Sequence, residues 1–131
     1  MSATPISPFD DDEGLAFVAR IVDVGDEQLL VDAVDAVFES DFDYIDHGTA
    51  VRALIACECF AAQRMRESGD VPDELQGRIE EWIEPSSTLT EKAQEALRRI
   101  LWTCEHRGRW DEISLFRDWP DRVESLLRRL D

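Results

Sequence analysis

The most apolar part of the chain is the stretch TAVRALIACECFAAQRMR, residues 49–66, in which apolar side chains fall on every face of a helix. A helix that is apolar all round normally lies inside a domain, where other helices cover it. Four polar side chains interrupt the stretch before its end: Arg52, Glu58, Gln63 and Arg64. We therefore expect this helix at the centre of the fold.

Further segments carry apolar residues at helical spacing and are separated by breaks rich in Gly, Pro, Ser and Asp. These segments cover about 11–22, 27–39, 73–83, 90–105, 110–117 and 119–130. The sequence contains neither a strand pattern longer than four residues nor an internal repeat. It predicts an all-α protein, a compact bundle of six or seven helices in a single domain spanning 1–131, with residues 1–6 as a loose lead-in.

Short polar motifs indicate where two of these helices begin. Asp10 with Glu13 fits an acidic capping box for the first helix, and Thr88 with Glu91 fits one for the helix at 90–105. Gly14 lies inside the first helix at a cost of ~1 kcal/mol. The expected apolar stripe of that helix consists of Leu15, Phe17, Val18, Ile21 and Val22.

Length and composition limit the class of protein. The chain has 131 residues, of which 44% are hydrophobic, enough for one core. Residues 49–66 carry Arg52 and Glu58 in mid-span, which argues against a membrane span, and the first residues lack the pattern of a secretory signal. Three cysteines without framework spacing fit free thiols in a reducing compartment. We expect a cytoplasmic protein that does not act at a membrane.

Negative charge is concentrated in the first part of the chain. The formal net charge is −16, and residues 1–49 contain thirteen acidic residues against one basic residue, Arg20. Nucleic-acid binding needs a basic footprint, so this balance disfavours it. A basic protein partner is compatible with the charge.

Three groups of residues resemble the uncharacterised bacterial domain of unknown function 4259 family. Residues 7–15, SPFDDDEGL, are similar to that family's Gly-Pro-Phe-x-Asn-Asp-x-Ala opening. Residues 53–62 followed by VPDEL at 71–75 are similar to its Ala-rich helix and the Leu-Pro-Glu helix start after it. Residues 93–101, then WDE at 110–112 and the 119–130 tail, look like its closing segments. The chain departs from the family pattern at residues 3–6 and 105–109. The resemblance supports the helical fold and implies no established activity.

Two groups of residues invite a chemical interpretation. Asp10, Asp11, Asp12 and Glu13 could hold Mg²⁺ or Ca²⁺, although acids in a first helical turn are also typical of capping. His47 with Asp43 or Asp46 could act as an acid–base pair, but no nucleophile motif accompanies it. We predict no catalytic residue, no metal ligand and no cofactor.

The favoured function is protein–protein binding, in which an acidic surface recognises a basic protein such as a bacterial toxin or nuclease. The predicted surface consists of Asp32, Asp35, Glu39, Asp41, Phe42, Asp43, Tyr44 and Asp46. Two alternatives stay open. The protein could be a metal-binding protein or hydrolase that uses the 10–13 region or His47. It could also be a housekeeping protein whose acidity serves only solubility or adaptation to salt, with both aromatics packed in the core.

Overall fold

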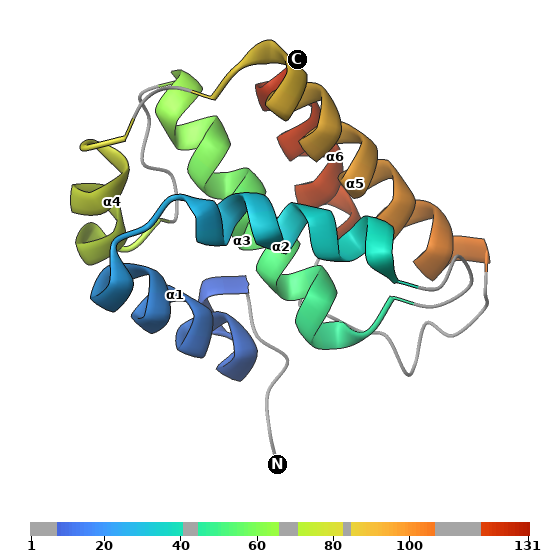
Figure 1. Ribbon diagram of the computed structural model, residues 1–131. Coiled ribbons are helices and arrows are strands. Elements are labelled where there is room, and N and C mark those ends of the chain that lie inside the picture. Colours follow the sequence, from blue (N-terminus) through green and yellow to red (C-terminus); the bar gives the residue numbers. More distant parts are fainter. Residues whose placement is uncertain (1–7, 41–44, 66–70, 83–84, 107–118) are drawn as a thin grey trace.

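A computed structural model of the chain describes residues 8–40, 45–65, 71–82, 85–106 and 119–131 (Figure 1). All of the regular secondary structure in these ranges is helical, which confirms the predicted all-α class. The elements are the 3-10 helix η1 (Pro8–Asp10) and six α-helices: α1 (Asp12–Val24), α2 (Gln28–Glu39), α3 (His47–Met65), α4 (Asp73–Ile79), α5 (Ser87–His106) and α6 (Trp119–Leu130). The lead-in expected at 1–6 and the helix expected at 110–117 lie outside the described residues.

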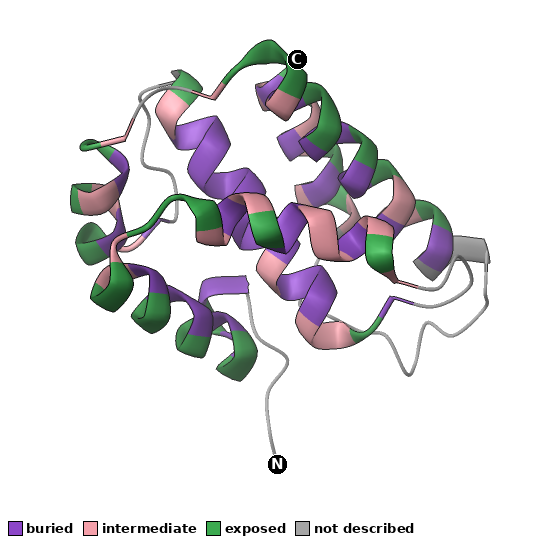
Figure 2. Ribbon diagram, viewed as in Figure 1, coloured by how far each residue is buried: buried purple, intermediate pink, exposed green. Residues whose placement is uncertain are grey.

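Helix α3 packs against every other described helix, from η1 and α1 on one side to α5 and α6 on the other. Each residue from Ala53 to Ala62 is buried, and Figure 2 shows this as continuous purple along the middle of α3. The small side chains of this stretch let neighbouring helices approach closely, while Leu54, Ile55 and Phe60 fill the space between them. The burial of both polar and apolar positions here means that α3 has no solvent-facing stripe over this length.

The capping residues differ from those predicted for two helices. Asp11, not Asp10, is the N-cap of α1, and its Oδ1 accepts a hydrogen bond of 2.9 Å from the Glu13 N–H. Helix α5 begins at Ser87, because the Ser86 hydroxyl oxygen accepts a hydrogen bond of 3.2 Å from the Leu89 N–H. Thr88 therefore lies within the first turn instead of capping it. In both cases an acceptor side chain one or two residues from the predicted one occupies the cap.

The end of α1 is fixed by a glycine and by an arginine of α4. Gly25 has φ 72°, the left-handed conformation that favours glycine, and its N–H donates to the Ile21 carbonyl at 2.8 Å. The Arg78 guanidinium donates to the Val22 carbonyl through Nε at 3.1 Å and Nη2 at 2.9 Å. A cation at the C-terminal end of a helix also interacts favourably with the helix dipole. Arg78 thereby joins α4 to α1.

Gly14 occupies the middle of the buried stripe of α1, and this overturns the prediction for Leu15. Successive helical residues are rotated by about 100°, so Gly14, Phe17, Val18 and Ile21 share one face. These four residues are buried, whereas Leu15 is 53% exposed. The apolar pattern suggested a stripe that included Leu15, because glycine has no hydrophobic side chain by which its position could be recognised.

The backbone of η1 explains why a glycine is needed at this point. A Cβ atom added to Gly14 would lie 1.8 Å from the Pro8 carbonyl oxygen and 3.0 Å from Ile55 Cδ1. A carbonyl oxygen of the main chain cannot rotate away as a side chain can. Gly14 therefore permits the close approach of α1, η1 and α3. This benefit is not included in the helix-propensity cost of a glycine inside a helix.

Helix α6 is attached to α3 by apolar contacts and by a buried ion pair. Val123, Leu126 and Leu130 are buried against the core. Glu58 of α3 is only 2% exposed, and its carboxylate lies 3.2 Å from Arg122 Nη1 and 3.2 Å from Arg129 Nη1. Arg129 contributes a second hydrogen bond through Nη2 at 3.3 Å. Both arginines belong to α6, so one carboxylate fixes that helix at two points seven residues apart.

We predict opposite effects for the same substitution at two helical glycines. Gly14→Ala should lower the free energy of unfolding by ~1–3 kcal/mol, because it overpacks the contact with the Pro8 carbonyl. Gly77→Ala is the matched control: Gly77 is exposed within α4, and a Cβ atom added there would meet nothing within 4 Å. That control should raise the free energy of unfolding by ~0.5–1 kcal/mol. Urea denaturation followed by circular dichroism measures both, and equal gains would refute the assigned role of Gly14.

Candidate functional site

The N-terminal ends of α1 and α3 meet in a small polar cluster. His47 Nε2 lies 2.8 Å from Asp11 Oδ2, and Arg52 Nη1 lies 3.3 Å from Glu13 Oε2. The imidazole of His47 is 40% exposed, whereas the Asp11 side chain is 10% exposed. Two cross-links between residues far apart in sequence therefore hold the starts of the two helices together.

The partner of His47 differs from the two acids suggested by sequence proximity. Asp46 Oδ1 accepts a hydrogen bond of 2.8 Å from the Thr49 N–H, so Asp46 caps α3. Asp43 lies outside the described residues. The aspartate in contact with His47 is Asp11, 36 residues earlier in the chain. A pairing over this distance leaves no local sequence signal.

The acids Asp11 and Glu13 of this cluster each have partners within it. One oxygen of Asp11 accepts the capping hydrogen bond and the other contacts His47, while Glu13 is paired with Arg52. Among the residues that the structure describes, no group of three or more His, Cys, Asp or Glu side chains lies close enough together to hold a metal ion. The contacts link the N-terminal ends of α1 and α3. Negative charge is favourable at the N-terminal end of a helix because of the helix dipole.

The two described thiols lie deep in the core on α3. Cys57 and Cys59 are both 0% exposed, and Cys57 Sγ lies 3.9 Å from the Ala93 carbonyl oxygen. Burial raises the pKa of both thiols well above the usual range, and the nearby Glu58 carboxylate raises it further. Each thiol therefore stays protonated at neutral pH and packs as a small apolar group, not as a nucleophile or a metal ligand.

The predicted acidic surface is divided by the structure into three groups. Asp32 and Glu39 are exposed on α2, and Asp32 Oδ1 accepts a hydrogen bond of 3.0 Å from Gln28 Nε2. Asp35 is half-buried and forms an ion pair with Lys92 of α5. Asp46 is exposed but serves as the cap of α3. The other four predicted residues, Asp41, Phe42, Asp43 and Tyr44, lie outside the described residues.

Three further acids extend the exposed part of this surface toward the start of α2. Asp23 lies in the last turn of α1, and Asp26 and Glu27 lie in the connection to α2. All three side chains are exposed. Asp26 Oδ1 accepts a hydrogen bond of 2.9 Å from the N–H of Gln28, the first residue of α2. We call Asp23, Asp26, Glu27, Asp32 and Glu39 the α2 acidic surface. Glu27 had no distinguishing sequence signal beyond its charge.

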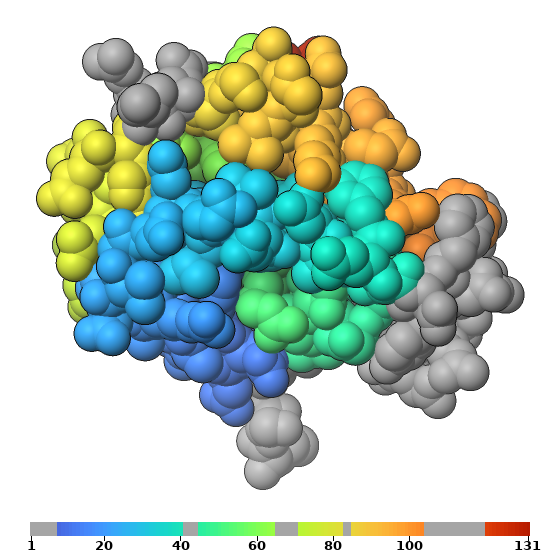
Figure 3. Space-filling view, viewed as in Figure 1, coloured from blue at the N-terminus to red at the C-terminus, as the bar shows by residue number. Residues whose placement is uncertain are grey.

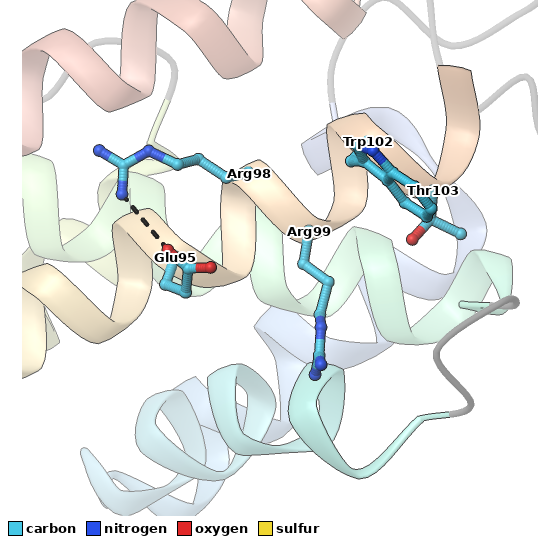
Figure 4. A pocket seen from close by; sticks show the side chains of 5 residues that line it. All are labelled: Glu95, Arg98, Arg99, Trp102 and Thr103. Atoms are coloured by element: carbon cyan, nitrogen blue, oxygen red, sulfur yellow. Dashed lines mark ion pairs between the residues drawn. The ribbon is translucent and has the colours of Figure 1, made fainter. Parts of the chain in front are cut away.

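Two hollows lie beside this surface, at opposite ends of the contact between α2 and α5. The first has a volume of about 330 Å³ and is lined on α5 by Glu95, Arg98, Arg99, Trp102 and Thr103 (Figure 4). Arg98 points toward Glu95 and pairs with it at 3.5 Å, whereas Arg99 points the other way, toward α2. Its guanidinium lies 5.3 Å from the centre of the Phe38 ring. The two guanidinium groups diverge and do not form a common anion site.

The second hollow lies where the starts of α2 and α5 meet the later part of α3. It has a volume of about 280 Å³, and Figure 3 shows atoms of α3, in green, between blue α2 and yellow α5. The described residues that line it are Glu27, Gln28, Val31, Phe60, Gln63, Pro85, Ser86 and Leu89. We call it the α2–α3–α5 hollow. It adjoins the α2 acidic surface through Glu27.

The comparison with protein families assigns almost the whole of this structure to one family. The model of the family described as "Domain of unknown function (DUF4259)" matches residues 3–122. The chain belongs to the DUF4259 family. No curated protein and no solved structure matches it. The DUF4259 match covers η1 to α5 and the start of α6, and it includes Arg122 but not Arg129.

The basic side chains of this DUF4259 protein are directed mainly at its own structure. Most of those described contact an acid or a carbonyl within the fold: Arg52 with Glu13, Arg64 with the Asp131 carbonyl, Arg78 with the Val22 carbonyl, Lys92 with Asp35, Arg98 with Glu95, and Arg122 and Arg129 with Glu58. The α2 acidic surface forms no ion pair among the described residues. Of the described helices, none combines the length and the apolar character that crossing a membrane requires.

We predict that two neighbouring acids of the DUF4259 opening motif differ in their effect on stability. Asp11→Ala removes the N-cap and the partner of His47 and should lower the free energy of unfolding by ~1–2 kcal/mol. Asp12→Ala removes an exposed acid of the first turn and should lower it by no more than ~0.5 kcal/mol. Thermal and urea unfolding of the two variants provide the comparison. An equal loss in both would show that the cap and the His47 contact contribute nothing beyond charge.

Proposed function

We propose that this DUF4259 protein binds a basic protein through the α2 acidic surface. The observation that carries the proposal is that five exposed acids on and beside α2 have no cationic partner among the described residues, whereas most of the described basic side chains contact acids or carbonyl groups of the fold. Unpaired surface carboxylates keep their hydration and their charge, and both are available to a partner. A basic toxin or nuclease belongs to the class of partner that this surface suits.

The position of these acids on a helix supports the proposal further. Asp32 and Glu39 are seven residues apart on α2, so they lie on one face, and α2 is packed against α3 and α5. Charges held on a packed helix keep a fixed spacing, which favours complementarity with a defined set of cations. The field of such a surface also raises the rate of encounter with an oppositely charged protein.

A need for solubility alone would also place acids on the surface. Solubility and partner binding make different predictions about whether the location of an acid on the surface matters. If the acids serve solubility or adaptation to salt, any exposed acid of the protein is equivalent to any other. If they form an interface, the acids of α2 matter more than acids on other helices. An experiment that moves the same charge change between two faces therefore separates the explanations.

We predict that reversing charge on α2 slows association. The variant Asp32→Lys with Glu39→Lys should associate about tenfold more slowly with a basic partner captured from the source cells, because steering by the surface is lost. Glu80→Lys with Glu124→Lys is the matched control: it changes the net charge equally, at exposed positions after α4 and on α6. Surface plasmon resonance at a series of salt concentrations measures both rates.

The dependence on salt completes the test. Exposed charges are screened beyond about 8 Å at physiological ionic strength, so association of the unaltered protein should slow as salt rises. The control variant should keep most of this dependence, and the α2 variant should lose much of it. A partner whose association rate responds neither to salt nor to the α2 substitutions would contradict the proposal.

A further inference from the structure

The described lining of the α2–α3–α5 hollow combines apolar and uncharged polar side chains with one charged residue at its edge. Val31 and Leu89 are half-buried, and Phe60, which is 3% exposed, lies deepest. Among the described residues that line the hollow, Glu27 carries the sole formal charge. It is exposed and forms no ion pair with any described residue. The hollow therefore offers an apolar cavity with a carboxylate at its edge.

The hollow is large enough for one large side chain. Its volume is about 280 Å³, at the lower limit of the ~300–1,000 Å³ that small-molecule and cofactor sites typically occupy. Protein interfaces commonly place one large anchoring side chain in a pocket of this kind, and Trp, Tyr and Arg are the commonest anchors. The question is then which of these side chains the lining would select.

The starts of α2 and α5 would favour an anion here if their N–H groups were free, but one N–H group at each start is already bonded to a side chain. The Asp26 carboxylate accepts from the Gln28 N–H at 2.9 Å, and the Ser86 hydroxyl oxygen accepts from the Leu89 N–H at 3.2 Å. These bonds reduce the number of free donors at the two helix starts. The formal charge among the described lining residues is that of Glu27, next to Asp26, so the electrostatic preference of this lining is for a cation.

We infer that the α2–α3–α5 hollow binds one arginine side chain of the basic partner. This inference rests on the proposed function and names the anchor of the same interface. An arginine has a long apolar stem that packs against the Val31 and Leu89 walls, and its weakly hydrated guanidinium can reach the Glu27 carboxylate. A lysine would leave a compact and strongly hydrated ammonium at the same place. A leucine or a tryptophan would fill the cavity and leave Glu27 without a cation.

A small probe tests the hollow without a partner protein. The probe is N-acetyl-arginine methylamide, titrated into ¹⁵N-labelled protein while the backbone amide signals are followed by NMR. The matched control is the citrulline analogue, which has the same shape and no charge. We expect saturable shifts at Val31, Gln63 and Leu89 with the arginine probe and at least about fivefold weaker binding of the citrulline probe. Equal responses to the two probes, or no saturable response to arginine, would overturn the inference.

Three substitutions locate the effect. Glu27→Gln should weaken binding of the arginine probe about fivefold, the effect of losing one solvent-exposed ion pair. Glu124→Gln removes the same charge at an exposed position on α6, outside the hollow and outside the α2 acidic surface, and should leave the affinity unchanged. Val31→Trp should fill the hollow and abolish the shifts, provided that circular dichroism shows an intact fold. An equal effect of Glu27→Gln and Glu124→Gln would show that general charge, not the hollow, attracts the probe.

The same measurements separate this inference from the proposed function. One outcome is that association of the partner depends on salt and on Asp32 and Glu39, while the arginine probe causes no shifts. In that case the inference about the hollow is wrong and the proposed binding surface on α2 is supported. If the arginine probe binds and responds to Glu27→Gln, but association ignores the α2 charge reversals, the hollow is supported and the proposed steering surface is wrong.

Discussion

The buried carboxylate of Glu58 sets the position of α6 against the rest of the protein. A charge that is 2% exposed is costly to remove from water unless cations and hydrogen bonds compensate it. Arg122 and Arg129 provide this compensation at 3.2 Å each, and both extend from α6. Apolar contacts alone are less directional than hydrogen-bonded ion pairs. The two arginines require that one face of α6, at one register, meets Glu58.

This constraint is related to the charge of the surface. The arginines on Glu58, the Arg78 contact with α1 and the Lys92–Asp35 pair all direct cations toward the interior or toward helix junctions. The charged groups exposed to solvent on α2 are then carboxylates, those of Asp32 and Glu39. The α2 acidic surface is thus, in part, a consequence of how the fold uses its few basic residues. The α2–α3–α5 hollow adjoins this surface through Glu27, and in the proposed interface it would contribute the apolar contact that charge alone does not provide.

The sequence predicted the helices well because helical periodicity is a local property. The predicted segments 27–39 and 49–66 agree with α2 and α3 to within two residues at each end. Two caps were placed one or two residues from their observed positions, and the other errors concern contacts between distant residues. Leu15 was expected in the core, but the close approach of Pro8 places Gly14 there. The resemblance to the DUF4259 family was also correct, because the family model matches residues 3–122.

The candidate site was predictable only in part. The outward position of Asp32 and Glu39 follows from their helical spacing, and the structure shows both exposed. The pairing of Asp35 with Lys92 and of His47 with Asp11 joins residues 57 and 36 positions apart, and no local pattern signals either. The α2–α3–α5 hollow is likewise formed by three segments that meet only in the folded protein. Sequence reasoning could identify charge and face, but not which charges the fold neutralises.

The most direct test of this account is a double-mutant cycle on the contact between Glu58 and Arg129. The free energy of unfolding is measured by urea denaturation for the unaltered protein, Glu58→Gln, Arg129→Gln and the double variant. We predict a coupling of about 1–3 kcal/mol, with Glu58→Gln alone destabilising the protein, because Arg129 then loses its carboxylate partner. Additive effects of the two substitutions would contradict the claim that this buried ion pair holds α6 in place.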